Sequence, residues 1–245
     1  MRYNALLLDK ENGIATITLD RPPMNAVNEE LLNELVAACE EIEGDDEIHA
    51  VILTGKGRAF SAGRDLPSVL AGEEFPGGPR YKVLENLSKP VIAAVNGFCF
   101  TGSFELAMCA DIIIASDKAV FGDTHARFGI VPGGGQTQRL PRIVGARKAK
   151  ELMFTSRTFR AEEAEQLGIV NKVVPHDDLD VEARKMAEQI LENIPETISA
   201  MKALVNDSMS LDLDSGLERE AAYHHDGPIS PTPEGRDRME GFLKK

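Results

Sequence analysis

Five consecutive apolar residues, Val91–Val95, constrain the fold of this chain most strongly. A strand with one face in water alternates apolar and polar residues, and this run does not alternate, so both of its faces are predicted to be covered. His49–Leu53 predicts a second buried strand. Strand-like and helical segments then alternate to about Val174, which predicts an α/β fold with helices packed against a sheet.

Turn and cap signals predict further elements. Residues 3–9 and 14–19 are short apolar runs separated by Asn12-Gly13, and this pair predicts a β-hairpin because both residues tolerate positive φ. Residues 29–43 predict a helix, with Asn28 as its N-cap and Gly44 at its C-terminal end. Other predictions are strands at Asp111–Ala115 and Ala119–Phe121, helices at Asp65–Leu70, Phe104–Ala110 and Gln136–Leu140, and a loop at Ala71–Arg80.

The chain changes character after Pro175. Four helices are predicted there, punctuated by proline and glycine, at residues 178–193, 196–209, 214–225 and 232–244. We therefore expect a mixed α/β core over residues 1–190 and a helical C-terminal region over residues 191–245.

The net charge indicates which partners to expect, and the cysteines indicate the cell compartment. The formal net charge is −13, so nucleic acid and anionic membrane surfaces are not expected partners. No apolar run approaches the roughly 20 residues of a membrane span. The three cysteines lie in apolar contexts and no targeting peptide is visible, which predicts buried free thiols and a cytoplasmic protein. The basic residues between positions 139 and 150 either attract an anionic ligand or form a helix face that is exposed to solvent.

Three segments have the composition of a catalytic site. In Ala59–Leu66, the small residues Ala62 and Gly63 leave a backbone N–H uncovered. In Asn96–Glu105, a helix opens near Gly102, where an unpaired N–H and the helix dipole suit a developing oxyanion. Loss of one such donor typically costs about 3–4 kcal/mol of activation free energy.

Glu105 follows one turn into that helix. A carboxyl group among apolar neighbours is expected to have a raised pKa, which suits acid–base work, although a first-turn glutamate can also simply cap its helix. The third segment, Phe121–Gly135, contains His125 and ends in a glycine run that predicts a tight turn or close backbone approach. No histidine pair has metal-ligand spacing with a third ligand, so no metal is expected.

Taken together, these segments resemble the crotonase superfamily, also called the enoyl-CoA hydratase/isomerase family. Their order along the whole chain is specific, although each motif alone is a weak signal. The matching motifs are Asp20-Arg21-Pro22, Asn25-Ala26, Ala59–Asp65, Lys89–Gly97, Glu105–Asp111, Pro132–Leu140, and Ala161–Ala164 with Gly168-Ile169-Val170.

The resemblance implies a fold of ββα turns wound into a superhelix, with C-terminal helices that form a homotrimer or a hexamer. It implies an acyl-CoA thioester as substrate and no separate cofactor. By position, the N–H groups of Ala62 and Gly102 match the oxyanion hole. Substrate binding is expected from Ala62, Gly63, Arg64, Asp65 and Gly102.

The resemblance also implies a reaction, with one departure. Family hydratases share a water molecule between two glutamates, and Glu105 matches the first. The second falls at position 125, which is histidine here, while Asp123 is out of register and is not expected to substitute directly. We predict an enoyl-CoA hydratase with Glu105 and His125 as catalytic residues. A double-bond isomerase, a thioester or C–C hydrolase, and a low-activity acyl-CoA-binding protein stay open as alternatives.

Overall fold

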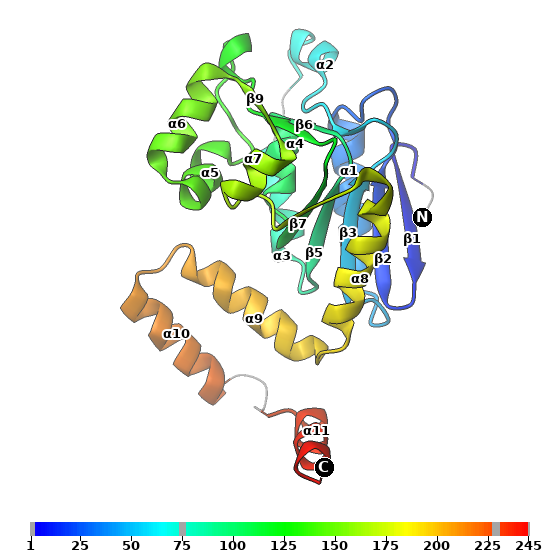
Figure 1. Ribbon diagram of the computed structural model, residues 1–245, viewed down its shortest axis with the longest axis vertical. Helices are drawn as coiled ribbons and strands as arrows, with labels where there is room; N and C mark the ends of the chain where they lie inside the picture. Colours follow the sequence, from blue (N-terminus) through cyan, green and yellow to red (C-terminus); the bar gives the residue numbers. More distant parts are fainter. Residues whose placement is uncertain (1–2, 74–76, 227–230, 245) are drawn as a thin grey trace.

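The structure is a computed structural model that describes residues 3–73, 77–226 and 231–244. It is a mixed α/β core with three C-terminal helices beneath it (Figure 1). The predicted fold class is confirmed. None of the described helices is long and apolar enough to cross a membrane.

The larger sheet has six strands in the order β1-β2-β3-β5-β7-β10. Its strands are β1 (Leu6–Glu11), β2 (Ile14–Leu19), β3 (Ala50–Gly55), β5 (Val91–Val95), β7 (Ile112–Ser116) and β10 (Lys172–Val174). β1 and β2 form the predicted antiparallel hairpin, with positive φ at Asn12 and Gly13. The other pairs are parallel, and all five residues of β5 are buried, as its unbroken apolar run predicts.

A second sheet of four strands runs in the order β4-β6-β8-β9. Its strands are β4 (Ala59–Ser61), β6 (Phe98–Phe100), β8 (Val120–Gly122) and β9 (Thr158–Arg160). Because β4, β6 and β8 directly follow β3, β5 and β7, each turn of the chain adds one strand to each sheet. The first three strands are parallel, so their carboxyl ends meet at one edge. The three segments singled out in the sequence leave the sheet at this edge.

Helices follow or cover these strands. They are α1 (Glu29–Glu43), α2 (Leu66–Leu70), α3 (Gly77–Asn86), α4 (Gly102–Ala107), α5 (Gln136–Val144), α6 (Ala146–Thr155), α7 (Ala161–Gln166) and α8 (Leu179–Leu191). α1 has the predicted bounds, because the side chain of Asn28 accepts a hydrogen bond from the amide of Leu31 and Gly44 ends the helix. α8 packs against β3, β5 and β7 of the larger sheet.

Several predicted boundaries differ from the structure, and two differences bear on the site. α4 begins at Gly102 and ends at Ala107, whereas the sequence predicts Phe104–Ala110. Gly77–Arg80 belongs to helix α3, although Gly77, Gly78 and Pro79 predict a loop. The central part of that predicted loop, residues 74–76, lies outside the described residues.

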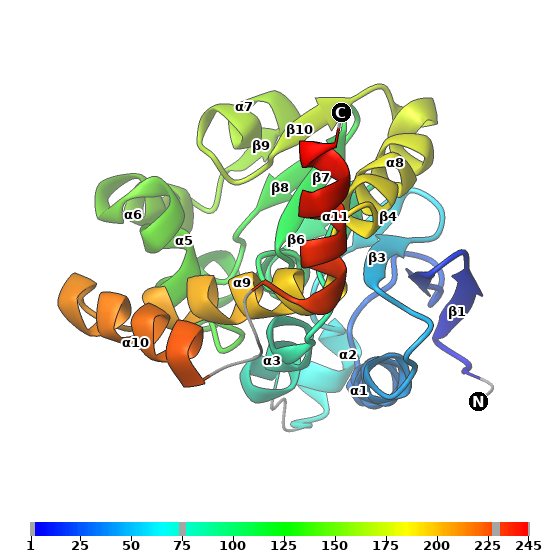
Figure 2. The same cartoon turned by 90° about the horizontal axis from the view of Figure 1, so that it is seen from below.

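The C-terminal helices are α9 (Pro195–Ser208), α10 (Leu213–Asp226) and α11 (Pro233–Leu243). α9 and α10 run side by side across one end of the core (Figure 2). α9 is tied to the core by the buried Lys202, whose Nζ lies 2.8 Å from Asp111 Oδ2 and donates to the carbonyl of Lys89 at 3.0 Å. α8 ends at Leu191 and α9 begins at Pro195. The division of the chain near residue 190 into a catalytic core and an oligomerisation region stays a prediction.

Candidate active site

The three segments line one pocket of about 320 Å³ at the carboxyl ends of β4, β6 and β8. We call it the site pocket. Its walls include residues from all three segments and from β9, among them Ala62, Arg64, Phe100, Thr101, His125 and Thr158. The structure therefore brings together segments that are up to about sixty residues apart in the sequence.

The amide of Ala62 does not face the site pocket. It donates a hydrogen bond to the carbonyl of Met24 at 2.9 Å, so the prediction that it belongs to an oxyanion hole is wrong. The amide of Gly63 donates to Ser61 Oγ at 3.2 Å, and that of Asp65 donates to the carbonyl of Val27 at 2.9 Å. These amides hold the loop in place and are not available to a ligand.

The amide of Arg64 has a different orientation. Val27 pairs with Arg64 as a parallel bridge that uses the carbonyl of Gly63 and the amide of Asp65, which turns the amide of Arg64 to the opposite side. There it faces α4, where its nitrogen lies 3.6 Å from the position that a Cβ would take on Gly102. The amide nitrogen of Arg64 thus lies beside Gly102, the first residue of α4.

Buried side chains fix this loop. The side chain of Asn25 donates from Nδ2 to the carbonyls of Lys56 and Ala59, at 3.0 and 2.9 Å, which anchors the start of β4. Gly63 has φ of +92°, and a Cβ there would lie 2.0 Å from Thr101 Oγ1. Only glycine allows the two loops to approach this closely.

Asp65, predicted to bind substrate, is occupied with structural contacts. Its Oδ1 lies 2.7 Å from Arg21 Nη1, and its Oδ2 accepts from the amide of Ser68 at the start of α2. Burial raises the pKa of the Asp65 carboxyl, but the hydrogen bonds from Arg21 and Ser68 outweigh it and leave the pKa below its ordinary value. Asp65 therefore supports the loop as an anion.

Glu105 lies in α4 and is 1% exposed. Its Oε1 accepts hydrogen bonds from the amides of Gly134 and Gln136, at 2.8 and 3.0 Å. The glycine run explains this approach, because a Cβ on Gly134 would lie 2.5 Å from Glu105 Oε2. Burial raises the pKa of Glu105 against the opposing effect of these two amides and of His125. The carboxyl group is thus fixed through one oxygen, and Oε2 is directed toward the second catalytic candidate.

That candidate is His125, whose Nε2 lies 3.8 Å from Glu105 Oε2. Its other ring nitrogen, Nδ1, lies 2.5 Å from Oδ1 of Asp123. Asp123 is 1% exposed, and sequence reasoning gave it no contact with the site. The structure therefore places one imidazole between two buried carboxyl groups. The signal available in the sequence was the Asp-X-His spacing, which lets an aspartate contact the residue two positions on.

The basic residues at 139–150 do not converge on the site pocket. Arg139 Nε lies 2.5 Å from Glu85 Oε1, and Lys148 Nζ lies 2.5 Å from Glu151 Oε2. Among the described residues, no group of three or more His, Cys, Asp or Glu side chains is arranged to hold a metal ion. The expectation of a metal-free reaction stays a prediction.

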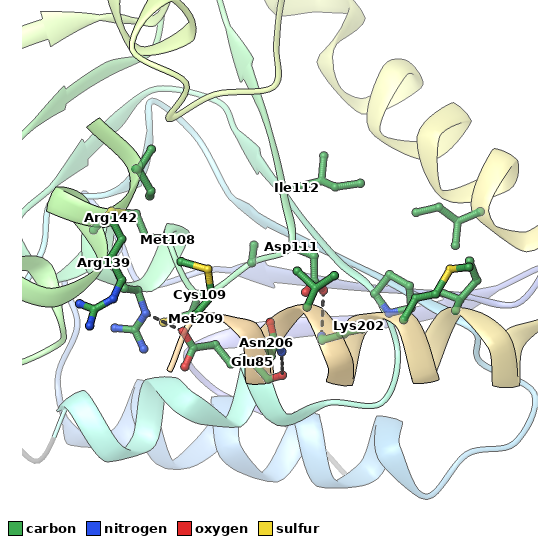
Figure 3. A pocket seen from close by; sticks show the side chains of 17 residues that line it. Glu85, Met108, Cys109, Asp111, Ile112, Arg139, Arg142, Lys202, Asn206 and Met209 are labelled. Carbon is green, nitrogen blue, oxygen red and sulfur yellow. Dashed lines mark hydrogen bonds and ion pairs between the residues drawn. The ribbon is translucent and has the colours of Figure 1, made fainter. Parts of the chain in front are cut away.

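A larger pocket of about 590 Å³ lies elsewhere, between α9 and the core (Figure 3). Its walls are mainly apolar, with Met108, Cys109, Ile112 and Met209 among them, and the ion pair of Lys202 with Asp111 lies at its edge. It contains none of the predicted site residues. The predicted residues Ala62, Arg64 and His125 line the smaller site pocket instead.

Comparison with known proteins identifies the relatives of this chain. The sequence profile of the enoyl-CoA hydratase/isomerase family matches residues 9–242. The chain is 41% identical to the short-chain-enoyl-CoA hydratase of Clostridium acetobutylicum, over 100% of this chain and 97% of that protein. It is 38% identical to the crotonyl-CoA hydratase of Syntrophomonas wolfei, with the same coverage. Its fold matches the crystal structure of an enoyl-CoA hydratase from Bacillus anthracis with a TM-score of 0.92 and 33% identity, over 98% of this chain and 96% of that one.

Proposed function

Because the chain belongs to the enoyl-CoA hydratase/isomerase family, we propose that it is an enoyl-CoA hydratase, which adds water across the α,β double bond of an acyl-CoA thioester. One observation in the structure carries this proposal. The amide nitrogen of Arg64 and Glu105 Oε2 lie 3.6 and 4.0 Å from the Cβ position on Gly102, and Oε2 lies 3.8 Å from His125 Nε2. This combination can stabilise an enolate and move two protons beside it.

The amide pair supplies the electrostatic part of the reaction. When water adds to Cβ, the electrons of the double bond move toward the thioester carbonyl, and negative charge develops on its oxygen. Donors that are already oriented stabilise that charge without reorganisation. The amide of Gly102 opens α4, so the backbone dipoles of this turn add to its effect. The pair of amides is therefore proposed to bind the carbonyl oxygen.

Glu105 and His125 supply the proton transfers. The 3.8 Å between Oε2 and Nε2 is longer than a hydrogen bond and suits a shared water molecule. His125 Nε2 accepts a proton from this water as its oxygen bonds to Cβ, and Glu105 donates its proton to Cα. Glu105 is placed for the second step because its Oε2 lies 4.0 Å from the Cβ position on Gly102, beside the proposed oxyanion site. The raised pKa of Glu105 favours the protonated form that this step needs.

The test is incubation of the purified protein with crotonyl-CoA, followed by mass spectrometry of the product. Hydration adds the mass of one water, and we expect it for the natural sequence. Glu105→Gln and His125→Ala should each lower kcat by about 10²–10⁴-fold, which is the usual contribution of one acid–base group. His176→Ala is the matched control, because His176 contacts Ser116 outside the site pocket.

The other products distinguish the remaining alternatives. Unchanged product mass with a moved double bond would indicate an isomerase, and free CoA would indicate a hydrolase. Tight binding without turnover of several enoyl-CoA thioesters would indicate a binding protein. Any of these outcomes would overturn the proposal of a hydratase. Full activity of Glu105→Gln would remove this residue from the mechanism.

We further propose that the protein works as a homotrimer or a homohexamer. Its support is the apolar surface of the C-terminal helices, where Leu213, Leu217, Met239, Phe242 and Leu243 are all more than half exposed. Apolar patches of this kind mark interfaces in soluble proteins. Sedimentation at micromolar concentration should give three or six times the chain mass of 26.7 kDa, and a monomer would contradict the proposal.

Two further expectations accompany this function. The proposed steps use only side chains, backbone amides, water and the thioester, so we propose that no separate cofactor is needed. Dialysis against a chelator should leave the rate unchanged. We also propose a cytoplasmic location, supported by three buried cysteines that form no disulfide. Fractionation of the source cell would test it.

A further inference from the structure

Asp123 is a buried carboxylate that the steps above do not use. It follows β8 directly and is 1% exposed. Its Oδ1 accepts a hydrogen bond from the backbone amide of His125 at 3.0 Å and lies 2.5 Å from the ring Nδ1 of the same residue. Within the described part of the chain, His125 is its sole ion-pair partner. The contact therefore joins Asp123 to one side chain that lines the site pocket.

A local turn explains the contact of Asp123 with the backbone amide but not its contact with the imidazole ring. An aspartate that accepts from the amide two residues on forms an Asx turn, which stabilises a loop by itself. The turn makes no demand on the side chain of the second residue. The ring contact is an additional interaction, and it fixes both side-chain torsions of His125. A purely structural role would leave it unexplained.

The two contacts also select the tautomer of the imidazole. Oδ1 already accepts the amide proton, and an ionised carboxylate offers acceptors only, so Nδ1 must carry a proton. A neutral imidazole with its proton on Nδ1 has a lone pair on Nε2. Nε2 is the nitrogen that faces Glu105 Oε2 at 3.8 Å. The ring is thus presented with its proton-accepting atom toward the water site.

From this geometry we propose that Asp123 is a positioning residue, which holds His125 in the Nδ1–H tautomer and balances the charge of the imidazolium formed during hydration. In that step the water proton moves to Nε2 while the water oxygen bonds to Cβ and Glu105 protonates Cα. The imidazolium then returns its proton to Glu105 Oε2 through water, which restores the starting state. The chemical part of the proposal rests on the hydratase function; the tautomer does not.

The tautomer can be measured without substrate, by ¹⁵N NMR of protein labelled at the histidine ring nitrogens. The His125→Ala variant identifies the signals of this ring. We expect Nδ1 of His125 to be protonated and Nε2 to be unprotonated in the neutral ring, and we expect Asp123→Asn to change that population. A neutral ring with its proton on Nε2 in the natural protein would overturn the proposal, whether or not the protein is a hydratase.

Kinetics supplies the second test, with crotonyl-CoA as the substrate. Asp123→Asn should lower kcat by about 10- to 10³-fold and leave KM within about threefold, because it disturbs proton transfer and not binding. In a His125→Ala background, the same substitution should cause no further loss. An equal loss in both backgrounds would show that Asp123 does not act through His125.

Asp117→Asn is the matched control. Asp117 also accepts a hydrogen bond from a histidine amide, that of His176 at 3.0 Å, but it lies outside the site pocket. This variant should retain the kcat of the natural protein and the ring signals of His125. If the natural protein hydrates no thioester, the kinetic test has no signal, and the NMR measurement alone decides the proposal.

Discussion

At the scale of single residues, Glu105 combines a catalytic requirement with a cost in stability. Its pKa is raised from the ordinary value of 4.5 because burial disfavours the charged form. The folded protein therefore binds this proton more tightly than the unfolded chain does. Relative to a neutral side chain, the contribution of Glu105 to stability falls as the pH rises from the unfolded pKa through the folded pKa.

Glu105→Gln should therefore raise the melting temperature while it removes activity. The glutamine can still accept the hydrogen bonds from Gly134 and Gln136, but it carries no charge to desolvate. We expect the gain to be largest at a pH above the folded pKa of Glu105 and to shrink as the pH falls through that pKa and the natural residue becomes protonated. Thermal denaturation across this range measures it. A lower melting temperature for the variant at every pH would show that burial of the charge is not the dominant effect.

Gly134 gives a second prediction at this scale. A Cβ at this position would lie 2.5 Å from Glu105 Oε2 and 2.8 Å from Tyr81 Cε2, so Gly134→Ala must displace the carboxyl group. A shift of about 1 Å in a catalytic group can reduce the rate about 10²-fold. At Gly133, a Cβ would meet nothing within 4 Å, so Gly133→Ala is the matched control. Steady-state hydration kinetics of the two variants should separate them, and equal rates would contradict the predicted displacement.

At the scale of elements, the attachment of α9 to the core depends on Lys202. Its ammonium contacts Asp111 and the carbonyls of Leu84 and Lys89 in a buried position. Lys202→Met would leave these acceptors without their cation and should lower the free energy of unfolding by about 1–3 kcal/mol. Lys185→Met is the control, because Lys185 is exposed and its pair with Glu182 should contribute less than about 1 kcal/mol. Urea denaturation measures both; equal effects would show that the buried contacts do not stabilise α9.

Local signals predict those elements that depend on local interactions. α1 has its predicted bounds because Asn28 and Gly44 interact with the backbone of the same helix. The hairpin is predicted for the same reason, since its turn needs only Asn12 and Gly13. α3 is missed because it begins at Gly77-Gly78-Pro79, which are poor helix formers, and packs against α1 and α4 of the folded protein. Tertiary packing overrides weak propensity there.

The same distinction applies to the site. The order of the motifs predicts that Gly102, Glu105 and His125 share a pocket region, and the structure brings them together. Which amide of residues 62–65 faces this region depends on the pairing of Arg64 with Val27, about forty residues earlier in the chain. The ring contact of Asp123 depends on the side-chain torsions of His125. Neither the orientation of this amide nor the ring contact can be obtained from residue spacing, so the sequence did not predict that Ala62 N–H bonds Met24 or that Asp123 contacts His125.

At the scale of the whole molecule, the apolar surface of the C-terminal helices predicts self-association. Leu217 in α10 is 55% exposed, and Leu217→Glu would place a charge within the proposed interface. We expect this variant to sediment as a smaller species than the natural protein. Val181→Glu is the control, because Val181 is similarly exposed, at 63%, but lies on α8 of the core. An unchanged sedimentation coefficient for Leu217→Glu would exclude this surface from the interface.

Successive turns of the spiral each deliver a different part of the site. In the proposed site, the turn through β4 supplies the amide of Arg64, the turn through β6 supplies Gly102 and Glu105, and the turn through β8 supplies Asp123 and His125. Substitutions in the turn through β8 can therefore change the acid–base residues while the turns through β4 and β6 stay the same. Such a chain would catalyse a different reaction and still bind the same substrate. For the same reason, a designer who seeks new chemistry on this scaffold can confine a library to residues 123–128.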